Sequence, residues 1–217
     1  MEERYTSYKL EKSRNGLTVP VINGIYLHSI YNPCKEGHAI AELHRPTLEN
    51  NNNVLILGLG FGYHVEEIAK ILNQTHKKSK IIILEPNRKL AEDFVSMRNF
   101  EDKDIEILST NDISELFSDL DFINFLMLKP ALVKHDASFT LDADFYKSFL
   151  SYSSPKEITG FKHILNQSSQ KLFSQFNEYS IHQATKAIIS QQETNSKSAS
   201  LLMAFAEVVK SPYKGRM

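Results

Sequence analysis

The spacing of hydrophobic and polar positions changes along the chain. Three short mixed runs come first, over residues 8–13, 17–22 and 25–29. Each gap between them holds an Asn-Gly pair: Asn15-Gly16 and Asn23-Gly24. Asn-Gly favours the positive φ angles of a tight hairpin turn, so the pattern predicts a small three-stranded meander. Pro20 lacks an N–H and is therefore unfavourable in the middle strand.

A helix is predicted next, over residues 34–44. Asn32 supplies an N-cap and Pro33 suits the first helical turn. Pro46 is expected to end the helix, because the residue before a proline avoids the helical conformation. The polar tract 49–53 reads as a loop and as a boundary between domains.

Continuous apolar runs then alternate with helical patterns. The runs that predict strands cover residues 54–57, 81–84, 105–108 and 122–128. Helical patterns fill the intervals over residues 65–72, 87–97 and 112–120. Uninterrupted apolar strands are typical of a parallel sheet covered on both faces, and the short intervals favour βαβ units. The sequence thus predicts an α/β fold, with a Rossmann-like, mostly parallel sheet.

Beyond residue 141 only helical patterns remain, interrupted by a polar tract over residues 191–200. We therefore expect a β-meander plus helix over 1–48, a Rossmann-like αβ domain over 49–140 and a helical extension over 141–217. The extension is expected to pack on its own domain or to form a homo-oligomer.

Composition narrows the functional classes. The chain has 217 residues, 41% of them hydrophobic and 24% charged, with a net charge of −1. With a net charge this close to zero, the protein has no overall electrostatic attraction for nucleic acid or a membrane surface. No apolar run is long enough to span a bilayer. The charged N-terminus does not resemble a signal peptide, and Cys34 is the single cysteine. These features favour a cytoplasmic protein.

The most informative motif is a turn with alternating glycines directly after the strand 54–57. The glycines are Gly58, Gly60 and Gly62. In an αβ sheet this turn lies at the carboxyl edge, where backbone N–H groups of the following helix can bind an anionic ligand. The pattern is G-x-G-x-G and not the dinucleotide pattern G-x-G-x-x-G. It is closer to the loop of S-adenosylmethionine-dependent methyltransferases, although Ile56 occupies the place of their usual acid.

Glu85 closes the next predicted strand, about twenty residues beyond the glycine turn. A carboxylate at that place can accept hydrogen bonds from two ribose hydroxyls, which predicts a nucleoside or nucleotide-sugar site. The alternative is structural. In it the glycines only let a helix pack closely on the sheet, and Glu85 caps the next helix.

Tyr63 and His64 begin the helix after the turn. His64 can donate to a phosphate or carboxylate, in which case its pKa is expected to rise. The alternative is a surface or half-buried histidine that is hydrogen-bonded to a carbonyl. The tripeptide Lys134-His135-Asp136 faces the ligand edge or forms a plain loop. No metal site is predicted, because the histidines at 28, 38 and 44 lack zinc-ligand spacing with cysteines.

Two stretches resemble a known family. Residues 16–42 contain Y-L-H-S-x-Y-x-P-x-x-E at 26–36, and residues 55–68 read LILGLGFGYHVEEI, with an I-L-E-P strand end at 83–86. Together they resemble the N-terminal part of the motility accessory factor (Maf) glycosyltransferases, whose loop reads roughly G-L-G-x-G-Y-H. Gly58–His64 match that loop throughout.

The resemblance implies a bacterial protein of flagellin glycosylation. Family members transfer a nonulosonic acid from a cytidine monophosphate (CMP) sugar to Ser or Thr of flagellin. Their central domain, similar to the MptE-like pterin pyrophosphokinases, carries a G-x-G-P-S-L loop that this chain lacks. The resemblance thus implies substrate docking or an accessory part, with flagellin and a nucleotide-sugar as partners and no assignable catalytic residue.

Two other functions fit the same residues. The first is an S-adenosylmethionine-dependent methyltransferase-like protein, on the strength of the glycine turn and Glu85. The second is a non-enzymatic scaffold that keeps the Rossmann-like fold.

Overall fold

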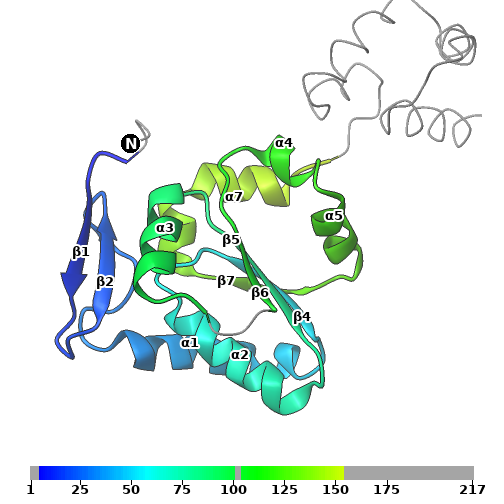
Figure 1. Cartoon of the computed structure of the whole chain (residues 1–217), viewed down its shortest axis with the longest axis horizontal. Helices are drawn as coiled ribbons and strands as arrows, with labels where there is room; N and C mark the ends of the chain where they lie inside the picture. The colour runs from blue at the N-terminus through cyan, green and yellow to red at the C-terminus, as the bar shows by residue number, and fades with distance from the viewer. Residues whose placement is uncertain (1–4, 101–103, 154–217) are drawn as a thin grey trace, which may run out of the picture. The chain divides into compact units, whose positions relative to one another are not determined.

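The structure is a computed structural model that describes residues 5–100 and 104–153 (Figure 1). The chain divides into two compact units, residues 1–153 and 154–217, and everything described here belongs to the first. This first unit holds the meander, the parallel sheet and the helices up to residue 150. The helices predicted beyond residue 153, and the homo-oligomer that they would form, lie outside the described residues.

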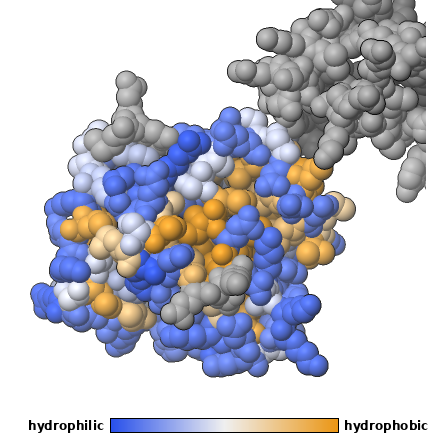
Figure 2. Space-filling view, viewed as in Figure 1, coloured by the Kyte–Doolittle hydropathy of each residue, from blue (hydrophilic) through white to orange (hydrophobic). Residues whose placement is uncertain are grey.

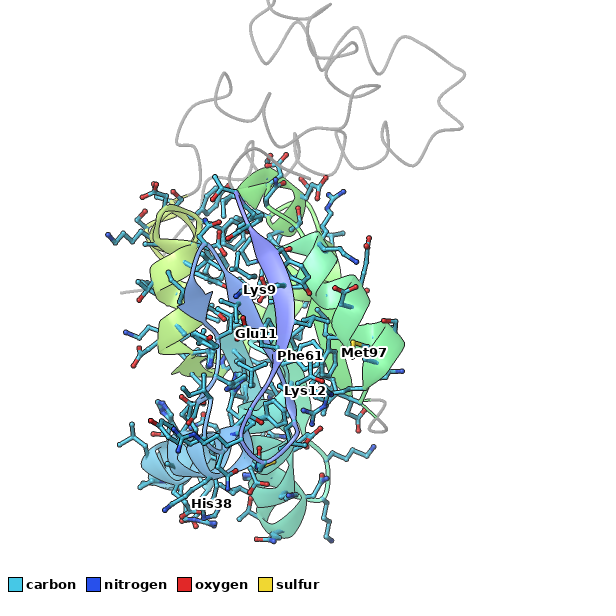
Figure 3. The ribbon with its side chains drawn as sticks, turned by 90° about the vertical axis from the view of Figure 1, so that its left-hand side faces the viewer. Lys9, Glu11, Lys12, His38, Phe61 and Met97 are labelled. Atoms are coloured by element: carbon cyan, nitrogen blue, oxygen red, sulfur yellow. The ribbon has the colours of Figure 1, made fainter. Side chains whose placement is uncertain are left out.

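The N-terminal meander is present. Its strands are β1 (Tyr8–Lys12), β2 (Thr18–Ile22) and β3 (Ile25–Tyr26), antiparallel in the order β1-β2-β3. Asn23 and Gly24 have φ angles of 50° and 78°, which confirms the predicted turn. Figure 3 shows β1 with its labelled residues Lys9 and Glu11, which form an ion pair.

Pro20 lies in the middle strand despite its missing N–H. Its carbonyl accepts from Leu27 N–H at 2.9 Å, so its backbone polar groups face β3. β3 pairs only with Val21 and Ile22 of β2. Pro20 therefore lies outside the residues of β2 that pair with β3, where an N–H donor is not needed. The sheet therefore loses little by holding a proline there.

Helix α1 (Pro33–Leu48) is longer than predicted. The Asn32 side chain accepts from Lys35 N–H, which confirms the N-cap. Pro46 lies inside the helix and does not end it, so that prediction was wrong. The last turn instead closes through Glu49 N–H, which donates to Arg45 O at 2.9 Å.

The second sheet has four parallel strands in the order β6-β5-β4-β7. They are β4 (Asn53–Leu57), β5 (Lys80–Leu84), β6 (Ile105–Leu108) and β7 (Ala131–Lys134). The helices are α2 (Tyr63–Thr75), α3 (Arg88–Met97), α4 (Ile113–Leu116), α5 (Leu120–Met127), α6 (Asp136–Leu141) and α7 (Ala143–Leu150). In chain order the strands run third, second, first, fourth, which is the start of the Rossmann arrangement. The predicted α/β, Rossmann-like class is confirmed.

One strand was predicted in the wrong place. Residues 122–128 belong mostly to α5, and the fourth strand is β7. The Asp119 side chain accepts from the backbone N–H groups of Asp121 and Phe122 and so starts a helix. Phe122 and Phe125, three residues apart, are buried on one side of that helix. β7 is an edge strand in which buried and exposed residues alternate.

The two faces of the sheet carry different helices, seen on opposite sides of it in Figure 1. Alternate residues such as Val54 and Ile56 share a core with the meander and with α1, α2 and α3. Their neighbours Leu55 and Leu57 share another with α4, α5 and α7. Among the described residues, no helix has the length and apolar character needed to cross a membrane.

Candidate functional site

The strand order creates a switch point between β4 and β7. The chain leaves β4 toward one face of the sheet and reaches β7 from the other. In open α/β sheets, ligands bind outside the carboxyl ends of strands at such a point. The glycine turn follows β4 and His135 follows β7, where His135 N–H donates to Leu57 O at 2.9 Å. The turn therefore lies at the carboxyl edge of the sheet, as predicted, and His135 lies at the same edge.

The glycine turn is packed against the protein's own side chains. Its three glycines have positive φ angles of 102°, 55° and 82°. A Cβ added to the first would collide with Ser138, one on the second with His28 and one on the third with Phe94. Phe61, labelled in Figure 3, is fully buried and meets the Phe94 ring edge to face. In this form the glycines allow close internal packing.

Glu85 is buried at the end of β5, with 1% of its surface exposed. One carboxylate oxygen accepts from Leu59 N–H at 2.9 Å, and the other accepts from Asn87 N–H at 3.0 Å. Burial, and to a lesser extent the charge of Asp142, raise the Glu85 pKa to about 8, although the two N–H donors oppose this shift. Both oxygens thus join β5 to the glycine turn and to the start of α3.

This arrangement matches the structural alternative for the turn. A hollow in the described surface lies along α3 and β6, between residues such as Ala91, Val95 and Ile107, and does not include Glu85. Figure 2 shows apolar side chains gathered among polar ones on this face. The nucleoside site at the glycine turn stays a prediction.

Tyr63 and His64 also point into the protein. Tyr63 is 2% exposed and its hydroxyl donates to Thr18 O at 2.8 Å, which ties α2 to the meander. His64 is fully buried, and its Nε2–H donates to Gly58 O at 3.1 Å. Burial, followed by the neighbouring His28, lowers the His64 pKa to about 3. The upward shift was expected for a histidine bound to an anion, and that binding stays a prediction. The carbonyl bond of the alternative is present, but on a fully buried ring rather than a surface or half-buried one.

Two further histidines meet His64. The ring centroids of His28 and His64 are 5.6 Å apart, and those of His28 and His135 are 4.6 Å apart. The rings of His64 and His135 stack at 4.5 Å and 11°. Each imidazole offers one nitrogen, and these three nitrogens lie within 4.8 Å of one another. We call His28, His64 and His135 the histidine cluster.

Each ring of the cluster is held from outside. His28 Nδ1–H donates to Glu36 Oε2 at 2.9 Å, and His135 Nδ1 lies 2.8 Å from Ser138 Oγ. Burial alone would raise the pKa of Glu36, yet it is lowered, because the carboxylate accepts from His28 and from Ser29 N–H. The inward nitrogens His28 Nε2 and His64 Nδ1 have no hydrogen-bond partner. Two bare lone pairs therefore face the interior of the cluster.

Sequence reasoning singled out His64 and left His135 either at the ligand edge or in a plain loop, and it predicted no metal site. The cluster was missed because its members come from three distant segments: the β3–α1 connection, the first turn of α2 and the residue after β7. Two signals pointed to it. His28 and His64 lie in the two stretches that resemble one family, and His135 follows the strand paired with β4.

Comparison with known proteins adds only a resemblance in fold. No family model and no curated protein matches the chain. A spermidine synthase in complex with the transition state analogue AdoDATO is 18% identical, with a TM-score of 0.43 over 63% of this chain and 48% of that one. Spermidine synthase from Thermotoga maritima is 17% identical, with a TM-score of 0.42 over 64% and 56%. MnmC2 from Aquifex aeolicus is 11% identical, with a TM-score of 0.38 over 94% and 86%. The chain thus spans about half the length of the two spermidine synthases.

Proposed function

We propose that this chain is a non-enzymatic accessory module of flagellin glycosylation, which docks the acceptor flagellin and does not bind the sugar nucleotide. One observation carries the proposal: the protein's own groups bond to the Glu85 carboxylate and pack against the glycine turn. Glu85 is 1% exposed, and both of its carboxylate oxygens already accept from backbone N–H groups, those of Leu59 and Asn87. The space beside the glycines is filled by side chains from α3, α6 and the β3–α1 connection.

The choice of flagellin rests on the resemblance to the Maf family. Its two stretches, residues 16–42 and 55–68, come together in space. His28 from the first stretch lies against Gly60 and His64 from the second, and Gly37 lies against the backbone of Tyr63 and His64. The residues that carry the resemblance thus build one structural unit, which supports reading them as one inherited domain.

A second candidate is an S-adenosylmethionine-dependent methyltransferase-like protein. The observation that favours it is the Rossmann strand order, with a glycine turn after β4 and a carboxylate at the end of the adjacent β5. To bind a nucleoside, the buried Glu85 carboxylate would have to become accessible. The same change would be needed for a CMP-sugar.

Calorimetry with the purified full chain separates these functions. The titrants are cytidine monophosphate, S-adenosylmethionine and S-adenosylhomocysteine, and purified flagellin is tested in a separate binding assay. We expect no heat from the three small molecules and saturable binding of flagellin. Failure to bind flagellin overturns the docking proposal.

A matched pair of variants tests whether any nucleoside binding uses the turn. Gly60→Val fills the turn, whereas Gly16→Val strains a similar positive φ at a site with nothing within 4 Å of the added Cβ. S-adenosylhomocysteine binding that Gly60→Val abolishes and Gly16→Val preserves would favour the methyltransferase function. Cytidine monophosphate binding with the same pattern would assign the turn to the sugar nucleotide.

A further inference from the structure

The unpartnered nitrogens of the histidine cluster need an explanation. Buried polar atoms in proteins are nearly always hydrogen-bonded, and the exceptions often mark an ion or water that belongs there. His28 Nε2 and His64 Nδ1 are two such atoms in one place, and both rings are buried. Since His28 Nδ1–H donates to a carboxylate and His64 Nε2–H to a carbonyl, both inward nitrogens carry a lone pair.

We propose that His28, His64 and His135 bind one divalent transition-metal cation of the zinc class through their inward nitrogens. Metal-bound histidines usually donate their other ring N–H to a carboxylate, carbonyl or water, which fixes the ring and its tautomer. Here the outer partners are Glu36 Oε2, Gly58 O and Ser138 Oγ. This inference does not depend on the proposed function.

The glycine turn places no side chain between the rings of His28 and His135. Gly60 presents no side chain to the cluster, and a Cβ there would lie 2.5 Å from His28 Nε2 and 3.2 Å from His135 Nε2. Any side chain at the second glycine of the turn would therefore press on the inward nitrogens of both rings. A substitution at Gly60 would crowd the cluster without removing a ligand.

Binding requires a small inward movement of the rings. Zinc–nitrogen bonds of about 2.0–2.1 Å in a tetrahedron hold ligand nitrogens about 3.3 Å apart. The three nitrogens now lie within 4.8 Å, so the widest separation closes by about 1.5 Å. The stacked rings of His64 and His135 must tilt so that both lone pairs meet one ion. His135 Nδ1–H then donates to Ser138 Oγ, and the long 3.4 Å bond from Ser138 N–H is given up.

The ligand set selects the class of metal. Three imidazoles suit zinc, copper, iron or nickel, whereas magnesium and calcium prefer oxygen ligands. Zinc has no d-electron preference for geometry and accepts three protein ligands with water in the fourth position. Burial lowers the pKa of all three histidines, so the neutral imidazole that a metal needs is already the stable form. Glu36 supplies a compensating negative charge behind His28.

Cobalt(II) titration of the chelator-stripped full chain tests the proposal. We expect one equivalent to bind with the intense visible bands of tetrahedral cobalt, and zinc to displace it. His28→Gln and His135→Gln should each lower the affinity at least 100-fold. The controls are His38→Gln, at an exposed position on α1, and the double variant His163→Ala/His182→Ala, which removes histidines outside the described residues. Both should bind like the wild type.

Two measurements keep the test decisive where a histidine variant does not fold. Glu36→Gln retains all three ligands and should weaken binding about 10–100-fold with an unchanged cobalt spectrum, as expected for an outer partner. In the wild type, long-range ¹⁵N–¹H NMR should show one metal-shifted nitrogen on each of the three cluster histidines after zinc is added. A stripped chain that takes up neither cobalt nor zinc overturns the proposal, as does unchanged binding by both folded histidine variants.

Discussion

Replacing Glu85 by glutamine should change how the stability of the protein depends on pH. Burial raises the Glu85 pKa from its ordinary 4.5 to about 8, so the folded state binds a proton more tightly than the unfolded chain. An acid with a raised pKa contributes most below pH 4.5, and this contribution is lost as the pH rises toward 8. The glutamine side chain would be neutral throughout and would not contribute such a loss.

The magnitude follows from the size of the shift. Each pH unit between the two pKa values changes the free energy of unfolding by roughly 1–2 kcal/mol. From pH 5 to pH 7 the wild type should therefore lose about 2–3 kcal/mol that Glu85→Gln does not lose. At pH 5 the variant should be less stable, by about 1–3 kcal/mol, because the amide has one acceptor oxygen for two backbone donors. The difference in the free energy of unfolding between wild type and variant should vanish or change sign by pH 8.

Urea unfolding at several pH values, followed by circular dichroism, measures this difference. Other carboxylates shift in the opposite direction, as Glu36 does, so the informative quantity is wild type minus variant at each pH. Glu92→Gln, at a position on the outer side of α3, controls for the loss of a formal charge. A difference that stays flat between pH 5 and pH 8 would refute the reasoning. It would mean that the two N–H donors keep the buried carboxylate ionised.

Three substitutions test the packing around the site, each by its urea-unfolding midpoint. Gly37→Ala should destabilise by about 1–3 kcal/mol, because its Cβ would lie 2.6 Å from the backbone carbon of Tyr63; stabilisation, as expected for alanine in a free helix, would contradict this contact. Tyr8→Phe should cost about 1 kcal/mol by removing the 2.6 Å bond to Asp93 that links β1 to α3, and a neutral result would show that the bond contributes nothing. Asn87→Ala should cost about 1 kcal/mol through loss of the α3 N-cap, and no change would exclude that role.

Local signals in the sequence predicted much of the fold. The Asn23-Gly24 turn, the caps at Asn32 and Asn87 and the strands before the glycine turn and Glu85 are all present. Each depends on neighbours in sequence: a turn geometry, a side chain that bonds a nearby N–H, or an apolar run. α5 was misassigned because its short apolar run is the same for a strand and a buried helix, and Asp119 decided between them.

The site was harder to predict, because its properties depend on distant residues. Whether Glu85 faces a ligand or the backbone is decided by the fit of Leu59 and Asn87 around it. The pKa of His64 falls because residues far away in sequence bury it beside His28. The spacing of residues along the chain indicates neither the backbone partners of Glu85 nor the lowered pKa of His64. The signals for a cluster were the two family-like stretches that hold His28 and His64, and the histidine that follows β7.

The meander has a consequence for anyone who wishes to shorten this protein. Leu27 and Ile22 belong to the same core as α2 and α3, and Thr18 O receives the Tyr63 hydroxyl. A fragment starting at residue 49 would uncover that face, leave a tyrosine hydroxyl without its acceptor and remove one of the three imidazoles. The smallest fragment worth expressing therefore begins before β1, because the first fifty residues contribute part of the hydrophobic core that covers one face of the parallel sheet.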